Sequence, residues 1–93
     1  MKNKNIIKIR KRLDKLDDKL LIIFKKRTLL VNKILNSKTY KNQIIDKKRI
    51  KIILKRIKKK SRKNQIDPKI TFKIWKSIIG AYIDYEFRNF KKK

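Results

Sequence analysis

The stretch IIKIRKRLDKLDDKLLIIFKKRTLLVNKILNSK, residues 6–38, decides the fold, because its apolar residues recur at alternating steps of three and four. The positions on this repeat are Ile6, Ile9, Leu13, Leu16, Leu20, Ile23, Leu30 and Ile34, with Arg27 at the remaining step. Such spacing is typical of the apolar stripe of a helix or of a coiled-coil seam. Because no Gly or Pro interrupts it, we predict one helix from Ile6 to about Lys38.

The length of this helix predicts an intertwined homodimer. At 1.5 Å per residue the helix spans about 50 Å. A chain of 93 residues forms a compact domain only roughly 30 Å across, from a radius of gyration near ~12 Å. The helix therefore overshoots any core that its own chain supplies, and a second copy is the simplest source of the missing surface.

The rest of the chain indicates two further helices. Residues 36–45 are polar and predict a loop. A second helix begins near Asp46 and fades into the basic stretch 58–63. The third begins cleanly, because Asp67 is a good N-cap and Pro68 suits the first helical position. We therefore expect an all-α fold with three helices per chain and a very long first helix.

The composition supports this fold and excludes several kinds of chemistry. The single Gly, Gly80, and the single Pro are too few turn residues for a many-stranded sheet. Gly80 lies inside the third helix, which indicates either close helix approach or simple tolerance. His and Cys are absent, so disulfides, a thiol nucleophile and the usual zinc sites are excluded. We expect a single domain over residues 1–93, in the cytoplasm and without a membrane span.

The net charge of +25 invites a nucleic-acid interpretation. The cations, however, are twenty-five lysines against seven arginines. Lys, Ile and Asn are all encoded by A/T-rich codons, so a biased base composition raises all three together, whatever the function. The charge by itself therefore does not name a function.

Three side chains near the predicted core are candidates for a functional site. Arg27 occupies a step of the stripe where Leu or Ile is expected, and a charge there needs an anionic partner. Lys38, eleven residues further on, returns to within about 20° of the same helix face. Glu86 is the only glutamate and continues the inner face of the third helix. The plainer alternatives are an Arg27 that reaches solvent, a surface Lys38, and a Glu86 that forms an ordinary salt bridge.

At this point the residues resemble a known family. Residues 9–21, IRKRLDKLDDKLL, followed by Lys26-Arg27, look like the first helix of the all-helical chorismate mutases. The similarity continues in order through Lys38, residues 46–49, residues 66–68 and residues 78–86. The resemblance, which extends to the mutase domain at the start of bifunctional mutase/prephenate dehydratase proteins, implies an isomerase. It would convert chorismate to prephenate by a pericyclic rearrangement, in the shikimate-pathway branch that makes phenylalanine and tyrosine, with no metal or cofactor.

The resemblance also implies which arginines bind the substrate. Arg27 and Arg49 would serve the site of their own subunit, whereas Arg10 would reach into the site of the other subunit. Helix geometry agrees with a trans role for Arg10, because it lies about 25 Å along the helix from Arg27. From position alone, Arg49 is an ordinary surface cation.

The remaining implied roles concern the reacting centre. By resemblance, Lys38 donates to the ether oxygen of the substrate, and Glu86, which must be protonated to do so, faces the same oxygen. Asp46 would lie near the hydroxyl group of the substrate and orient it, although by position alone Asp46 is an N-cap. Two positions depart from the family pattern: Ile50 replaces a glutamate that helps to bind the hydroxyl, and Tyr82 replaces a serine that contacts a carboxylate.

Three alternatives stay open from the sequence. One is an isochorismate pyruvate lyase, which resembles the mutases in fold and pocket. A second is a small basic nucleic-acid-binding protein, because residues 47–63 hold eleven cations. Those cations are expected to surround the helix rather than form one stripe, so binding to nucleic acid is not expected. A third is a catalytically inactive helical dimer kept for partner binding.

Overall fold

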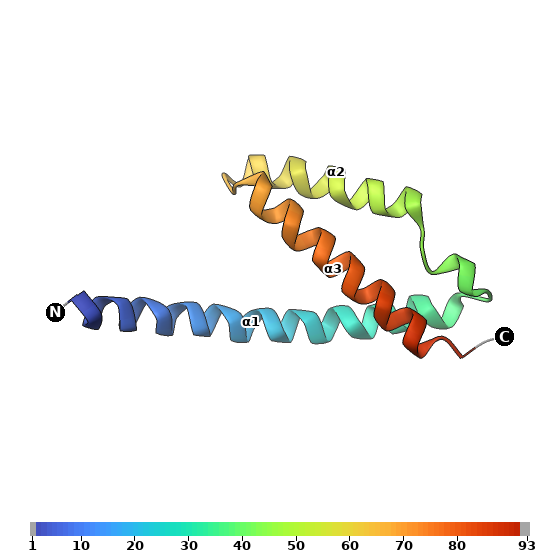
Figure 1. Cartoon of the computed structure of the whole chain (residues 1–93), viewed down its shortest axis with the longest axis horizontal. Helices are drawn as coiled ribbons and strands as arrows, with labels where there is room; N and C mark the ends of the chain where they lie inside the picture. Colours follow the sequence, from blue (N-terminus) through green and yellow to red (C-terminus); the bar gives the residue numbers. More distant parts are fainter. Residues whose placement is uncertain (1, 92–93) are drawn as a thin grey trace. The chain divides into compact units, whose positions relative to one another are not determined.

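A computed structural model describes residues 2–91, in which helices are joined by short non-helical connections (Figure 1). Its elements are α1 (Lys2–Ser37), the short 3-10 helix η1 (Lys41–Gln43), α2 (Lys47–Lys63) and α3 (Pro68–Asn89). No strand occurs between residues 2 and 91. The predicted all-α fold with three helices and a very long first one is confirmed, while the intertwined homodimer stays a prediction. The chain divides into two compact units, one up to Lys33 and one from Ile34 onward, which are described separately.

The first unit is a single stretch of α1 whose apolar stripe lies open. We call this stripe the α1 seam; it consists of Ile6, Ile9, Leu13, Leu16, Leu20, Ile23 and Leu30. Each of these side chains is at least 43% and at most 59% exposed. Helical periodicity has therefore placed the apolar residues on one face as predicted, but the single chain leaves that face in contact with water.

The second unit has a small core of its own. Leu35, Ile44 and Ile57 are 5%, 3% and 8% exposed, and α2 packs against α3. Two buried hydroxyls join these helices: the Oγ of Ser61 lies 2.6 Å from the Oγ1 of Thr71 and also donates to the carbonyl of Ile57 at 2.6 Å. Because each buried hydroxyl has a partner, these hydrogen bonds offset the cost of removing the two groups from water.

The turn between α2 and α3 ends one helix sharply and begins the next. Gln65 has a φ of 58°, the left-handed conformation that commonly follows the last turn of a helix. The N–H of Ile66 donates to the carbonyl of Ser61 at 2.8 Å, and that of Gln65 to Arg62 at 3.2 Å. This pairing is the Schellman arrangement, so the carbonyls at the end of α2 are satisfied within the turn.

The predicted start of α3 is confirmed by its cap. The side chain of Asp67 accepts a hydrogen bond from the backbone N–H of Lys69 at 2.9 Å, and Pro68 is the first helical residue. The first N–H of a helix has no partner within the helix, so the missing N–H of Pro costs no hydrogen bond there, and the fixed φ of Pro suits the helix.

The end of α1 and the start of α2 lie within one residue of their predicted places, Lys38 and Asp46. The predicted loop 36–45 is only partly a loop, because α1 continues through Ser37 and η1 occupies 41–43. Helix α2 does not fade within 58–63 but continues to Lys63. Lysine and arginine are good helix formers, and cations in the last turn interact favourably with the helix dipole.

Gly80 lies inside α3 without a close neighbour. Within the described residues, no heavy atom lies within 4 Å of the place where a Cβ would stand, the helix's own nearby backbone apart. The single chain therefore gives no close approach that requires glycine, and the interpretation of simple tolerance holds within one copy.

Candidate active site

The geometry of the site begins with an ion pair between Lys38 and Glu86. The Nζ of Lys38 lies 2.8 Å from the Oε1 of Glu86, and the two side chains are 16% and 10% exposed. They come from positions 48 residues apart, one just after α1 and one near the end of α3. Glu86, the only glutamate in the chain, is therefore largely buried and paired with Lys38, one of twenty-five lysines.

Local structure holds Lys38 in this position. The N–H of Lys38 donates to the carbonyl of Leu35 at 3.1 Å, which closes the last turn of α1. The side-chain oxygen of Gln43 then accepts from the N–H groups of Thr39 and Tyr40, at 2.7 and 2.8 Å. Because Leu35 and Ile44 at either end of this segment are both buried, the segment is fixed by packing as well as by hydrogen bonds.

Asp46 lies in the same hollow as Lys38. The hollow is lined by Ser37, Lys38, Asn42, Gln43, Ile45, Asp46, Lys47 and Lys48. Asp46 is exposed, and its Oδ1 accepts from the backbone N–H of Arg49 at 3.0 Å. Asp46 is thus the N-cap of α2, as position alone indicated, and its second carboxylate oxygen is still available for a ligand in the hollow.

Gln43 is a site residue that the sequence analysis missed. It lines the hollow beside Lys38 and Asp46 and fastens the backbone between them. The only available signal was a glutamine three residues after the start of a turn, which is a capping pattern. In a polar loop such a pattern carries little weight by itself.

The other predicted positions of the second unit lie nearby on the same helices. Tyr82 is half-buried on α3, one turn before Glu86, and its ring meets that of Tyr85 edge to face with centroids 6.3 Å apart. Ile50 is half-buried in the first turn of α2. Arg49 is exposed beside it, so its guanidinium is accessible to an anion.

The remaining two arginines belong to the first unit. Arg10 is exposed on α1, and Arg27 is half-buried on the same helix, at its step of the seam spacing. The expectation that Arg27 simply reaches solvent therefore holds only in part. Their roles toward a substrate stay predictions.

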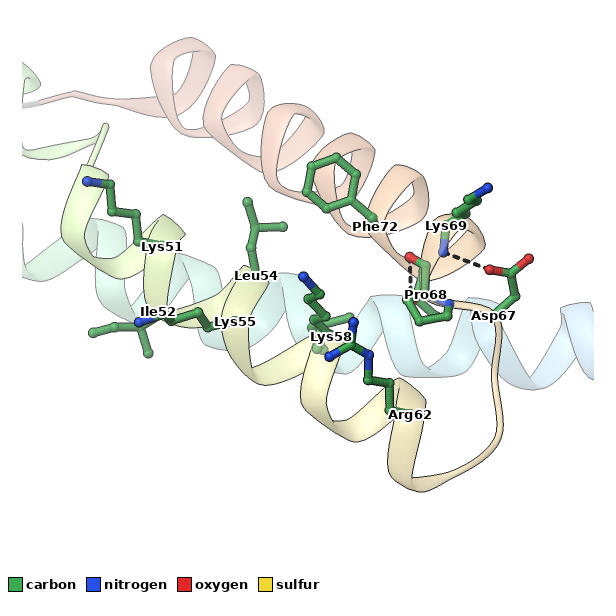
Figure 2. A pocket seen from close by; sticks show the side chains of 12 residues that line it. Lys51, Ile52, Leu54, Lys55, Lys58, Arg62, Asp67, Pro68, Lys69 and Phe72 are labelled. Carbon is green, nitrogen blue, oxygen red and sulfur yellow. Dashed lines mark hydrogen bonds between the residues drawn. The ribbon is translucent and has the colours of Figure 1, made fainter.

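A second and larger groove lies between α2 and α3, away from these residues. Its volume is about 770 Å³. Figure 2 shows Leu54 and Phe72 pointing into the space between the two helices, with Lys51, Lys55 and Lys58 along α2. None of the predicted site residues lines this groove. The carboxylate in its lining, that of Asp67, accepts from the N–H of Lys69 as the cap of α3. Because the groove contains none of the predicted site residues, whereas Lys38 and Asp46 line the smaller hollow, we place the candidate site at the smaller hollow.

Among the described residues, no helix is both long and apolar enough to cross a membrane.

The fold and the site thus define a small helical protein with a charged site. That site contains the largely buried pair Lys38–Glu86 and Asp46, the N-cap of α2. The chain belongs to the chorismate mutase type II family, whose model matches residues 9–87. It is accordingly an isomerase with chorismate mutase activity, and the resemblance seen in the sequence is confirmed. No curated protein and no solved structure matches the chain. None of these findings supports the lyase or the nucleic-acid alternative.

Proposed function

We propose that the chain converts chorismate to prephenate at a site built around Lys38 and Glu86, in the cytoplasm, for phenylalanine and tyrosine synthesis. The observation that carries this proposal is the 2.8 Å contact between these two side chains, both largely withdrawn from water. An ammonium group has three N–H donors. Lys38 can therefore keep its contact with Glu86 and still donate to the ether oxygen of the substrate.

The rearrangement occurs within one molecule, so it needs no nucleophile and no metal. Its rate rises when the compact reactive conformer is held in place. It rises further when fixed donors stabilise the charge that develops on the ether oxygen. Lys38 supplies one of these donors. Glu86 supplies the other in its protonated form, in which one oxygen still accepts from Lys38 while the O–H donates to the substrate.

The other residues bind and orient the substrate. Arg27 and Arg49 bind its carboxylates, because planar guanidinium groups make paired hydrogen bonds to carboxylates. Asp46 orients the hydroxyl group with the oxygen that its cap leaves available. Tyr82 takes the place of a serine and binds a carboxylate through its phenol.

The active form is a homodimer in which Arg10 of each copy enters the site of the other. The exposed α1 seam supports this proposal, because seven apolar side chains on one helix face remain uncovered in a single copy. Pairing with a second copy removes that surface from water.

The first experiment measures chorismate loss by ultraviolet absorbance, with product identification, on wild type, Lys38→Ala and Arg27→Ala. We expect wild type to form prephenate and Lys38→Ala to lower kcat about 100- to 1000-fold, the usual cost of one missing donor. Lys41→Ala, which changes an exposed lysine three residues away, is the matched control and should retain full activity. No turnover of chorismate by a folded wild-type protein would refute the proposal; the same assay with isochorismate tests the lyase alternative.

The trans role of Arg10 is tested by mixing two inactive variants. Arg10→Ala and Lys38→Ala proteins are denatured together and refolded at equal concentrations. Half of the dimers are then mixed, and each mixed dimer has one intact site, so about a quarter of wild-type activity should return. If Arg10 acts in its own subunit, the mixture stays inactive.

The donor role of Glu86 is tested by two substitutions. Glu86→Gln keeps a side-chain donor at this position, whereas Glu86→Ala removes it. We expect Glu86→Gln to keep most of the kcat and Glu86→Ala to lower it about 100- to 1000-fold, the usual cost of one missing donor. Equal kcat values for the two variants would contradict the role.

A further inference from the structure

The exposed side of α2 is a largely cationic surface. Helix α2 contains eight lysines and three arginines in 17 residues and no acidic residue. All eleven cations are exposed, and Ile52 is the only exposed residue of α2 that is not a cation. The residues facing inward are Ile50, Ile53, Leu54, Ile57 and Ser61, and none of them is charged. The cations leave only this inner face free, and Lys51, Lys55, Lys58 and Arg62 reach the α2–α3 groove. The expectation that cations surround the helix therefore holds except along the inner face.

This charge is not compensated by the chain. Within residues 2–91, the structure gives no ion pair to any of the eleven cations, while Lys38 and Glu86 pair with each other. The net charge of +25 on the whole chain adds to the positive potential that these cations create. Surfaces of one sign raise the local concentration of small ions of the opposite sign.

The candidate site lies at one end of this surface. Asp46 caps α2 and lines the hollow that contains Lys38. Lys55, Lys58 and Lys59 lie nine to thirteen residues further along α2, about 14–20 Å from Asp46 at 1.5 Å per residue. Such positions are too far to touch a small ligand in the hollow, yet they lie within the Debye length of about 30 Å at 0.01 M salt.

We infer that the cationic side of α2 captures the dianionic substrate by long-range attraction and thereby lowers KM. The inference rests on the proposed mutase activity, since chorismate carries two carboxylates. The transition state carries the same two charges, because the rearrangement moves no proton and releases no group. Attraction of equal strength to both states lowers KM and leaves kcat unchanged.

The test compares Lys55→Glu/Lys58→Glu/Lys59→Glu with the same three positions changed to Arg, which keeps the charge. None of the three residues belongs to the proposed site. At about 0.01 M ionic strength, KM for chorismate should rise about tenfold in the Glu variant, from Coulomb's law with screening. Its kcat should match that of wild type. At about 0.5 M, where the Debye length is only about 4 Å, its KM should match wild type as well. The Arg variant should behave as wild type at both salt concentrations.

Circular dichroism and the molecular mass in solution establish that both variants are folded and in the same oligomeric state. An active wild type with equal KM for all three proteins at low salt would overturn the inference alone. A KM rise that persists at high salt would also overturn it, because it would indicate a local effect on the site. A folded wild type that does not convert chorismate would overturn the proposed function together with this inference.

Discussion

The two units of the chain carry similar apolar patterns with opposite outcomes. In the second unit, α2 and α3 cover each other, and Ile57 is only 8% exposed. In the first, the α1 seam has the more regular repeat, and its side chains are 43–59% exposed. Periodicity thus determines which face of a helix is apolar, but not which chain supplies the covering surface. The difference between the two units is the main structural argument for a second copy.

The largest effect should come from placing charge on the α1 seam. Leu16→Glu/Leu20→Glu should abolish the dimer and much of the helical signal, since unpaired charges in a buried interface cost on the order of 4 kcal/mol or more. The matched control, Lys11→Gln/Lys15→Gln, changes the net charge equally on positions outside the seam. Sedimentation equilibrium and circular dichroism measure both. A Glu variant as dimeric and helical as the control would show that the seam stays open to water.

A smaller loss of stability is expected from a core substitution in the second unit. Ile57→Ala should lower the free energy of unfolding by about 2–4 kcal/mol, through lost burial and a residual cavity. Ile52 lies on the same helix but is 55% exposed. Ile52→Ala should therefore lower the free energy of unfolding by well under about 1 kcal/mol. Chemical denaturation measures both values. Equal losses would mean that a partner chain covers the outer side of α2 as well.

The buried hydroxyl pair should have an intermediate effect. Ser61→Ala removes one hydroxyl and should cost about 1–2 kcal/mol, the usual price of disturbing a buried hydrogen bond. Thr71 retains the carbonyl of Pro68 as an acceptor at 3.3 Å, which limits the loss. The double variant Ser61→Ala/Thr71→Val removes both hydroxyls. It should be less destabilised than the sum of the two single changes, and strict additivity in the unfolding free energies would contradict the pairing.

The smallest predicted effect is a gain in stability from a substitution at Gly80. Nothing in a single copy limits a methyl group there, so Gly80→Ala should stabilise α3 by about 0.5–1 kcal/mol. Thermal unfolding at several protein concentrations measures it. A loss instead of a gain, greatest at concentrations that favour the dimer, would place the partner chain against this turn of α3.

Much of the fold could be predicted because its signals are local. The repeat from Ile6 onward determines α1, and the Asp67-Pro68 pair determines the start of α3, since both depend on neighbouring residues only. The end of α2 could not be located, because a basic run carries no periodic apolar signal although lysine itself favours helix. The left-handed Gln65, which ends α2 at that place, has no side-chain feature that announces it.

The site could be predicted in part for the same reason. Lys38, Asp46 and Glu86 were candidates from position and resemblance, but the contact between Lys38 and Glu86 joins segments 48 residues apart. No local pattern specifies such a contact. Gln43 was missed because its importance comes from the two backbone N–H groups that it accepts. The role of Arg10 depends on a second copy, and the roles of both Arg10 and Arg27 stay predictions.

The ion pair between Lys38 and Glu86 has a consequence for preorganisation. A free lysine side chain samples many rotamers, and holding one in place costs about 1.5–2 kcal/mol of conformational entropy. Glu86 already orders the Lys38 ammonium before any substrate arrives. The entropy of positioning this donor is therefore lost during folding rather than during each catalytic cycle, and more of the substrate's binding energy remains to select its reactive conformer.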